Sequence, residues 1–172
     1  LIEDPNLGLL IKSKSGNTWS NLTQGNNRLD DSLDKTLQLA RNTQRIHLMS
    51  GNASPGDAAL VSDFTLGLHT ISATAVAALQ GARVLYVDYE RLDQGAQSPY
   101  SIFHSLGPER CVFYDLKSLR QAVLNYYIDP KSNPHLGDAS PILKQLDPFQ
   151  DIGASRRIAE YVGWYMEGLD RG

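Results

Sequence analysis

Short apolar runs alternate with longer segments of helical character along the chain. Five runs have the length and composition of strands, at residues 8–11, 45–49, 64–66, 83–88 and 111–114. Four segments carry the apolar spacing or the capping residues of helices, at residues 31–43, 54–61, 70–80 and from Asp115 onward. Strands that alternate with helices are typical of an α/β domain with a mostly parallel sheet.

The strongest strand signal is Arg83–Asp88. Its centre, Val84 to Val87, is continuously apolar, which predicts burial on both faces, as in a parallel sheet. The preceding helix, residues 70–80, has no charged residue and is expected to be buried on most sides, and Gly81 is its natural end. We therefore expect a Rossmann-like, doubly wound sheet of about five mostly parallel strands with helices on both faces.

An amphipathic helix is predicted near the C-terminus, from Ser155 to Leu169. Its apolar face consists of Ile158, Val162, Tyr165, Met166 and Leu169, with Tyr161 and Trp164 beside it. This face carries more apolar and aromatic surface than a single contact needs. We expect part of it, Trp164 above all, to be exposed in this chain or covered by a second molecule.

Composition and charge narrow the class of protein. The chain has 172 residues, of which 41% are hydrophobic and 20% charged, which is typical of one globular domain. The net charge of -3 and the lack of a long basic run give no support for a nucleic-acid partner. No apolar stretch approaches the roughly 20 residues of a membrane-spanning helix. The single cysteine, Cys111, lies in an apolar run and is expected to be a buried structural thiol.

Candidate chemistry lies where strands end and helices begin. In open α/β sheets, ligands bind at the carboxyl ends of the strands, and the free N–H groups of a helix start favour a phosphate. The segment from Asp63 to Thr74 has this form, with a glycine-containing turn and no carboxylate inside the helix start. Its candidate phosphate or nucleotide ligands are Gly67, His69, Thr70, Ser72 and Thr74. The alternative is that these residues only cap a core helix.

Among these residues, His69 is also the candidate catalytic base. Two further pairs of charged residues lie at the ends of strands. Lys12 and Lys14 follow the first strand and could reach the same phosphates, although the alternative is a pair of solvated loop lysines. Asp88 and Glu90 follow the fourth strand. Their carboxylates could hold ribose or sugar hydroxyls, or Asp88 could only form a turn.

The four histidines show no spacing typical of metal ligands. His47, His69, His104 and His135 are far apart in the sequence, so we expect no metal site. The chain also lacks the glycine-rich dinucleotide fingerprint and the P-loop, and no cofactor is expected.

Three segments together resemble the C-terminal half of glycosyltransferases of the two-Rossmann-domain (GT-B) type. In that family a strand is followed by a turn of Gly, Ser or Thr, then by a helix that ends in Glu-Ala-x-x-x-Gly, and then by another strand. The same order is found here in Asp57–Asp63, Ala77–Gly81 and Val84–Asp88. The tail, from Leu146–Phe149 to Tyr161–Tyr165, is similar to the ends of bacterial proteins of surface-carbohydrate and polysaccharide biosynthesis.

This resemblance implies a fold and an activity. Residues 1–172 would form one Rossmann-like domain of a longer enzyme, and residues 153–172 would cross to a missing N-terminal domain. The chain would bind a nucleotide-activated sugar, with the diphosphate at Thr70–Thr74 and with Lys12 or Lys14 near the leaving phosphate. The catalytic base would lie on the other domain, so this chain alone is expected to be inactive. The implied location is cytoplasmic, with any attachment to the inner membrane made through other parts of the protein.

One position departs from the pattern of the resembling family. That family carries an acidic residue five positions before the glycine, where it usually binds the donor ribose, and this chain has Val76 there. A valine accepts no hydrogen bond from a ribose hydroxyl. Two other interpretations therefore stay open. One is a non-catalytic domain that binds a partner or another ligand, and the other is half of a sugar-nucleotide epimerase, which shares the fold.

Overall fold

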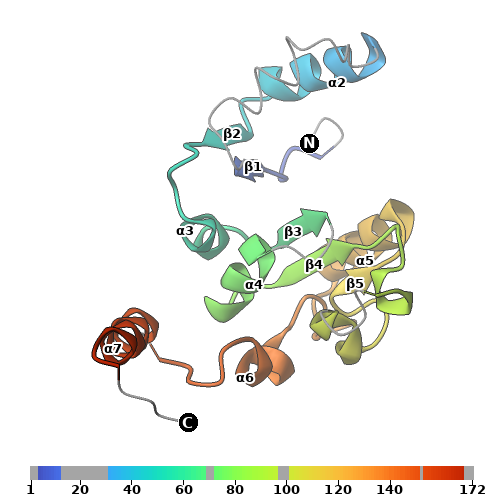
Figure 1. The fold of residues 1–172 in the computed structure, drawn as a ribbon. Helices are drawn as coiled ribbons and strands as arrows, with labels where there is room; N and C mark the ends of the chain where they lie inside the picture. The colour runs from blue at the N-terminus through green and yellow to red at the C-terminus, as the bar shows by residue number, and fades with distance from the viewer. Residues whose placement is uncertain (1–3, 13–30, 69–71, 97–100, 152, 169–172) are drawn as a thin grey trace.

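The structure, a computed structural model, describes residues 4–12, 31–68, 72–96, 101–151 and 153–168 (Figure 1). Parallel strands alternate with helices along it, which confirms the predicted α/β class. The strands are β1 (Leu9–Lys12), β2 (Ile46–Met49), β3 (Thr65–Leu68), β4 (Val84–Val87) and β5 (Val112–Phe113). The α-helices are α2 (Asp31–Asn42), α3 (Pro55–Leu60), α4 (Ser72–Leu79), α5 (Leu116–Ile128), α6 (Leu143–Leu146) and α7 (Ala154–Met166). Short 3₁₀ turns are η1 (Leu92–Gln94), η3 (Ile102–Leu106) and η4 (Ser140–Ile142).

The strands form two small parallel sheets, whereas one sheet of about five strands was expected. In the first sheet β1 pairs with β2, and in the second β4 lies between β3 and β5. The crossover from β2 to β3 runs through α3, a helix of only six residues that packs chiefly against α4. Among the described strands, β1 pairs with β2 alone.

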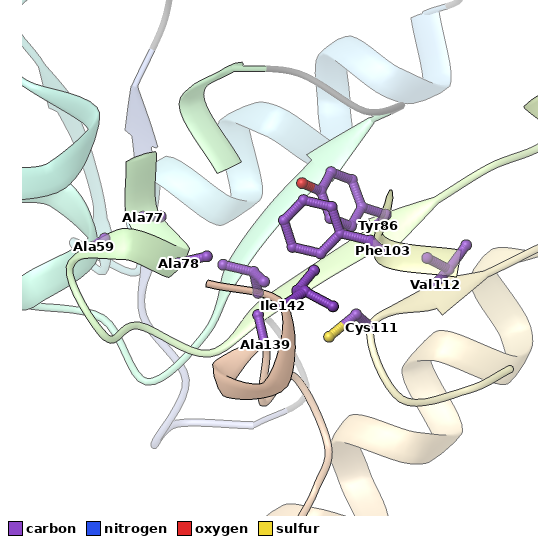
Figure 2. Packing of buried hydrophobic residues seen from close by; sticks show 10 residues of the cluster. Ala59, Ala77, Ala78, Tyr86, Phe103, Cys111, Val112, Ala139 and Ile142 are labelled. Atoms are coloured by element: carbon purple, nitrogen blue, oxygen red, sulfur yellow. The ribbon is translucent and has the colours of Figure 1, made fainter. Parts of the chain in front are cut away.

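The three-stranded sheet holds the core and has helical turns on both faces, as predicted. Along β4 the side chains alternate between the two faces. Val84 and Tyr86 pack with α4, η3, η4 and α6, as Figure 2 shows for Tyr86 and Phe103, whose ring centroids are 4.6 Å apart. Leu85 and Val87 pack against α5 on the opposite face. All four residues of β4 are buried, which confirms the expectation drawn from its continuous apolar run.

Local signals at the helix ends act as expected from the sequence. Ser54 caps α3 by accepting a hydrogen bond from the Gly56 N–H at 3.1 Å. Asp115 caps α5 in the same way through the Ser118 N–H at 2.8 Å. Gly81 follows α4 with a φ of +81°, the left-handed conformation in which glycine commonly ends a helix.

The irregular segment before α6 closes the amino edge of the three-stranded sheet. The Val84 N–H donates to the Gly137 carbonyl at 2.8 Å, and the Gly137 N–H donates to the Arg110 carbonyl at 2.7 Å. Gly137 has a φ of +72°, and a Cβ there would lie 2.9 Å from the Arg83 Cβ. Only glycine therefore allows the chain to pass so close to the start of β4.

Helix α7 stands apart from both sheets in Figure 1. The predicted exposure of its apolar face is confirmed, with exposed fractions of 87% for Tyr165 and 80% for Met166. The expectation for Trp164 was wrong, because this side chain is partly buried and packs edge-on against Tyr161 with centroids 4.9 Å apart. Leu169 lies outside the described residues. Among the helices that the structure describes, none is long and apolar enough to span a membrane.

Candidate functional site

The carboxyl end of β4 places a buried carboxylate at the edge of the three-stranded sheet. Asp88 directly follows the strand, and its N–H donates to the Phe113 carbonyl at 2.7 Å, which extends the pairing with β5. The residue is 2% exposed. Both carboxylate oxygens accept hydrogen bonds from the Leu92 N–H, at 3.2 and 3.0 Å. Asp88 therefore holds the start of η1 against the end of the sheet.

A histidine from η3 reaches the same carboxylate. Phe103 is 1% exposed and packs on Tyr86 in the core, which fixes η3 over the sheet. The next residue, His104, thereby points its ring at Asp88, with the Nε2 atom 2.9 Å from Oδ2. The other ring nitrogen, Nδ1, is buried and has no hydrogen-bond partner in the described structure. Among the described residues, Asp88 is therefore the hydrogen-bond partner that orients the imidazole ring.

A second carboxylate, from η1, faces the same imidazole. One oxygen of Asp93, Oδ1, lies 4.0 Å from His104 Nε2, is buried and has no hydrogen-bond partner among the described residues. The other, Oδ2, accepts a hydrogen bond from the Tyr114 hydroxyl at 3.1 Å. Tyr114 follows β5, so residues after two neighbouring strands meet here. Burial, together with the negative charge of Asp93, raises the pKa of Tyr114.

A guanidinium group completes this arrangement. The Arg91 side chain lies over the Tyr114 ring, 3.4 Å from its centroid, and its positive charge opposes the rise in the pKa of Tyr114. Arg91 has a φ of 55°, a left-handed conformation that is uncommon outside glycine and that turns the chain from β4 into η1. We call Asp88, Arg91, Asp93, His104 and Tyr114 the acid–histidine cluster.

Three groups of the cluster have the chemistry of metal ligands. One donor atom each from Asp88, Asp93 and His104 lies within 4.8 Å of the other two. Carboxylate oxygens and imidazole nitrogen together suit divalent transition metals. The same groups also form a buried hydrogen-bonded pair, Asp88 with His104, that holds two 3₁₀ turns at the end of the sheet.

The residues predicted to bind phosphate are distributed over β3 and α4. Gly67 lies inside β3, opposite Tyr86, and not in the turn after it. Ser72 is the first described residue of α4 and is exposed. Thr74 is 1% exposed and lies beside the Tyr86 hydroxyl, so it faces the core. His69 and Thr70 lie outside the described residues.

The start of α4 and the cluster lie along the same edge of the sheet. Leu68, the last residue of β3, is in register with Val87, the last residue of β4, and both strands run in the same direction. The first turn of α4 contains no acidic residue. Helix α4 begins four residues after Leu68, and Asp88 directly follows Val87, so both come after strands that end at the carboxyl edge, where α/β sheets commonly bind ligands.

The other predicted site residues divide between the two sheets. Glu90 is exposed in the turn between Asp88 and η1. Lys12 ends β1 in the two-stranded sheet, and its ammonium group donates to the Gly51 carbonyl at 3.1 Å. Lys14 falls outside the described ranges.

Sequence reasoning missed Asp93, His104 and Tyr114 as members of one site. The histidines show no spacing typical of metal ligands, and the three residues are spread over 22 positions counted from Asp93 to Tyr114. The available signal was indirect: polar residues in the loop that joins two predicted parallel strands at their carboxyl edge.

The chain matches no known protein family, and neither a curated protein nor a solved structure matches it. What can be concluded about function therefore depends on the geometry of the carboxyl edge and on the sequence.

Proposed function

We propose that this chain is the C-terminal, nucleotide-sugar-binding half of a glycosyltransferase of polysaccharide or surface-carbohydrate biosynthesis. The observation that supports the proposal most is the register of Leu68 with Val87. It brings the carboxyl ends of β3 and β4 side by side, at the edge of a parallel sheet where nucleotide ligands commonly bind. The segment order that resembles GT-B transferases supports the same assignment.

In this proposal the start of α4 binds the diphosphate. Ser72 offers a backbone N–H group and a hydroxyl at an exposed helix start that lacks acidic residues, and the helix dipole favours a negative charge there. His69 and Thr70 would add donors from the turn, and Lys12 or Lys14 would neutralise the leaving phosphate. Donors placed there would stabilise the negative charge that develops as the bond between sugar and phosphate breaks.

The two acidic residues after β4, Asp88 and Glu90, have different roles in this proposal. Glu90 is exposed and could accept hydrogen bonds from sugar or ribose hydroxyls. Asp88 is buried and is hydrogen-bonded to the Leu92 N–H and to the His104 ring, so we assign it first to holding the loop that carries Glu90. The base that activates the acceptor would come from the opposing domain, so this chain alone should transfer no sugar.

The experiment is a calorimetric titration of the chain with UDP, GDP, CDP and ADP. We expect one of them to bind weakly, with a dissociation constant on the order of tens of micromolar to millimolar, because the opposing domain contributes no contacts. A Ser72→Asp variant should bind at least about tenfold more weakly, because a carboxylate at the helix start repels phosphate. The same carboxylate interacts favourably with the helix dipole, so the variant should not destabilise the helix. The matched control is Ser155→Asp, at an exposed position in the first turn of α7. Equal binding by both variants and the wild type would contradict the proposed phosphate site.

The alternative function, a non-catalytic binding domain, is favoured by Val76. This residue lies on α4 and is 37% exposed, at the position where the resembling transferases carry the acid that binds ribose. We predict that Val76→Glu strengthens binding of the preferred nucleotide several-fold if the ribose pocket is retained. The same titration measures this effect, and a Val76→Gln variant controls for polarity without charge. Unchanged or weaker binding by Val76→Glu would favour the non-catalytic alternative.

A further inference from the structure

We propose that Asp88, Asp93 and His104 form a binding site for a divalent transition metal ion, such as Zn²⁺. This inference does not depend on the proposed nucleotide site, because it concerns the ligands of the ion alone.

The distances suit one ion bound between the three side chains. Metal bonds to carboxylate oxygen and imidazole nitrogen are about 2.0–2.2 Å long, so two donors on a tetrahedral zinc ion lie roughly 3.4 Å apart. His104 Nε2 lies 2.9 Å from Asp88 Oδ2 and 4.0 Å from Asp93 Oδ1, and both distances are within about 0.6 Å of this spacing. The donor atoms of all three residues lie within 4.8 Å of one another, so the widest pair needs to close by at most about 1.4 Å when the ion binds.

One oxygen of the site lacks any other partner. Asp93 Oδ1 is buried and accepts no hydrogen bond from the described residues, yet it faces the nitrogen of His104. A buried carboxylate oxygen without a donor is unfavourable, and a cation between it and the imidazole would satisfy it. This oxygen is the observation that distinguishes the site from an ordinary hydrogen-bonded Asp–His pair.

Hydrogen bonds from neighbouring groups also orient the two carboxylates, as is common for metal ligands. The Leu92 N–H fixes Asp88, and the Tyr114 hydroxyl fixes Asp93 Oδ2 and leaves Oδ1 free to bind an ion. The exposed fractions of the Asp88, His104 and Asp93 side chains are 3%, 12% and 24%. The site is thus largely enclosed, with its most open side at Asp93, where water or a substrate oxygen could complete the coordination.

The ligand set favours some metals over others. Mg²⁺ and Ca²⁺ prefer oxygen ligands only, whereas a nitrogen with two carboxylates suits Zn²⁺, Mn²⁺ or Fe²⁺. The two carboxylates together balance the charge of one divalent ion. We therefore take Zn²⁺ as the probe.

The test is a Zn²⁺ titration of the whole chain by calorimetry, followed by ¹⁵N NMR of the histidine ring nitrogens. We expect one equivalent to bind and the Nε2 resonance of His104 to move to the position of a metal-bound nitrogen. Asp93→Asn and His104→Gln should each weaken binding by about 100-fold or more, because each removes a ligand. The matched controls are Asp57→Asn and His135→Gln, exposed residues outside the cluster, which should bind as the wild type does.

The wild-type NMR measurement does not require a variant to fold. Saturation with Zn²⁺ that leaves the His104 resonances unchanged would overturn the proposal, as would the absence of binding at millimolar Zn²⁺. Loss of binding in His135→Gln would likewise overturn it, since it would assign the ion to a surface histidine.

Discussion

At the scale of single residues, burial decides the chemistry of Cys111. The thiol is fully buried in the apolar cluster formed with Tyr86, Phe103 and Ile142 (Figure 2). Burial raises its pKa to about 12, and the positive charge of Arg110 opposes this rise only in part. The predicted role of a buried structural thiol agrees with this position.

We predict that Cys111 does not react with a thiol reagent at pH 8 in the folded chain. In urea it should react completely, and the reaction is followed by absorbance or mass. The raised pKa also sets how the free energy of unfolding depends on pH. The unfolded thiol ionises near its ordinary pKa, so the free energy of unfolding falls as the pH rises above about 9 toward 12. Rapid modification of the native chain at pH 8 would contradict the burial of this side chain.

A second single-residue effect concerns Asp138, beside the close passage at Gly137. Asp138 Oδ2 lies 2.7 Å from Arg110 Nη2, and Oδ1 accepts from the Ser140 N–H at 3.0 Å. Burial tends to raise the pKa of this carboxyl, but the hydrogen bonds of Ser140 and the charge of Arg110 outweigh it, and the pKa is lowered.

Asp138→Asn should therefore lower the free energy of unfolding at pH 7 by roughly 1–3 kcal/mol. A group with a lowered pKa stabilises the fold above its unfolded pKa, and this contribution is lost as the pH falls through the lowered value. The difference between wild type and variant should accordingly shrink in acid, as measured by urea unfolding at pH 7 and at pH 3. Asp147→Asn serves as control, because the Asp147 carboxylate accepts a hydrogen bond from the Phe149 N–H of its own exposed turn, at 3.1 Å. A difference that is the same at both pH values would argue against this linkage.

At the scale of elements, α5 and α7 contrast although each has 13 residues. Helix α5 places Leu119, which is 7% exposed, against Leu85 and Val87 of β4. Helix α7 leaves its apolar face exposed, including Tyr165 and Met166. Its described contacts are mostly local: Arg157 bonds Asp151 at 2.7 Å, at the start of the helix.

We predict that Tyr165→Ser changes the free energy of unfolding by less than about 0.5 kcal/mol. Leu119→Ala in α5 should cost about 2–5 kcal/mol, because it leaves a cavity beside β4. Urea unfolding at neutral pH measures both. If Tyr165→Ser were as costly as Leu119→Ala, α7 would have to pack against the body of the protein in solution.

At the scale of the whole molecule, local sequence patterns determined some features and not others. The apolar run Val84–Val87 and the caps Ser54 and Asp115 act over a few residues, so the order of strands and helices could be predicted from them. Pairing between strands is a long-range property, and periodicity carries no information on whether β1 joins β3. The division into two sheets was therefore missed.

The candidate site was predictable only in its position. The carboxyl edge and Asp88 follow from the rule for parallel sheets. The meeting of Asp88 with His104 depends on the burial of Phe103, which anchors a 3₁₀ turn that has no apolar period of its own. No pattern in the sequence fixes that geometry, so the sequence predicts no role for this histidine.

We propose that the carboxyl edge of β3, β4 and β5 binds a nucleotide. A map of amide chemical shifts of the ¹⁵N-labelled chain, recorded as the preferred nucleoside diphosphate is added, tests this directly. We predict that the largest shifts lie at Leu68, at Ser72 and over residues 88–93. Shifts confined to the amino edge, around Gly81 and Gly137, or no shifts at millimolar nucleotide, would contradict it.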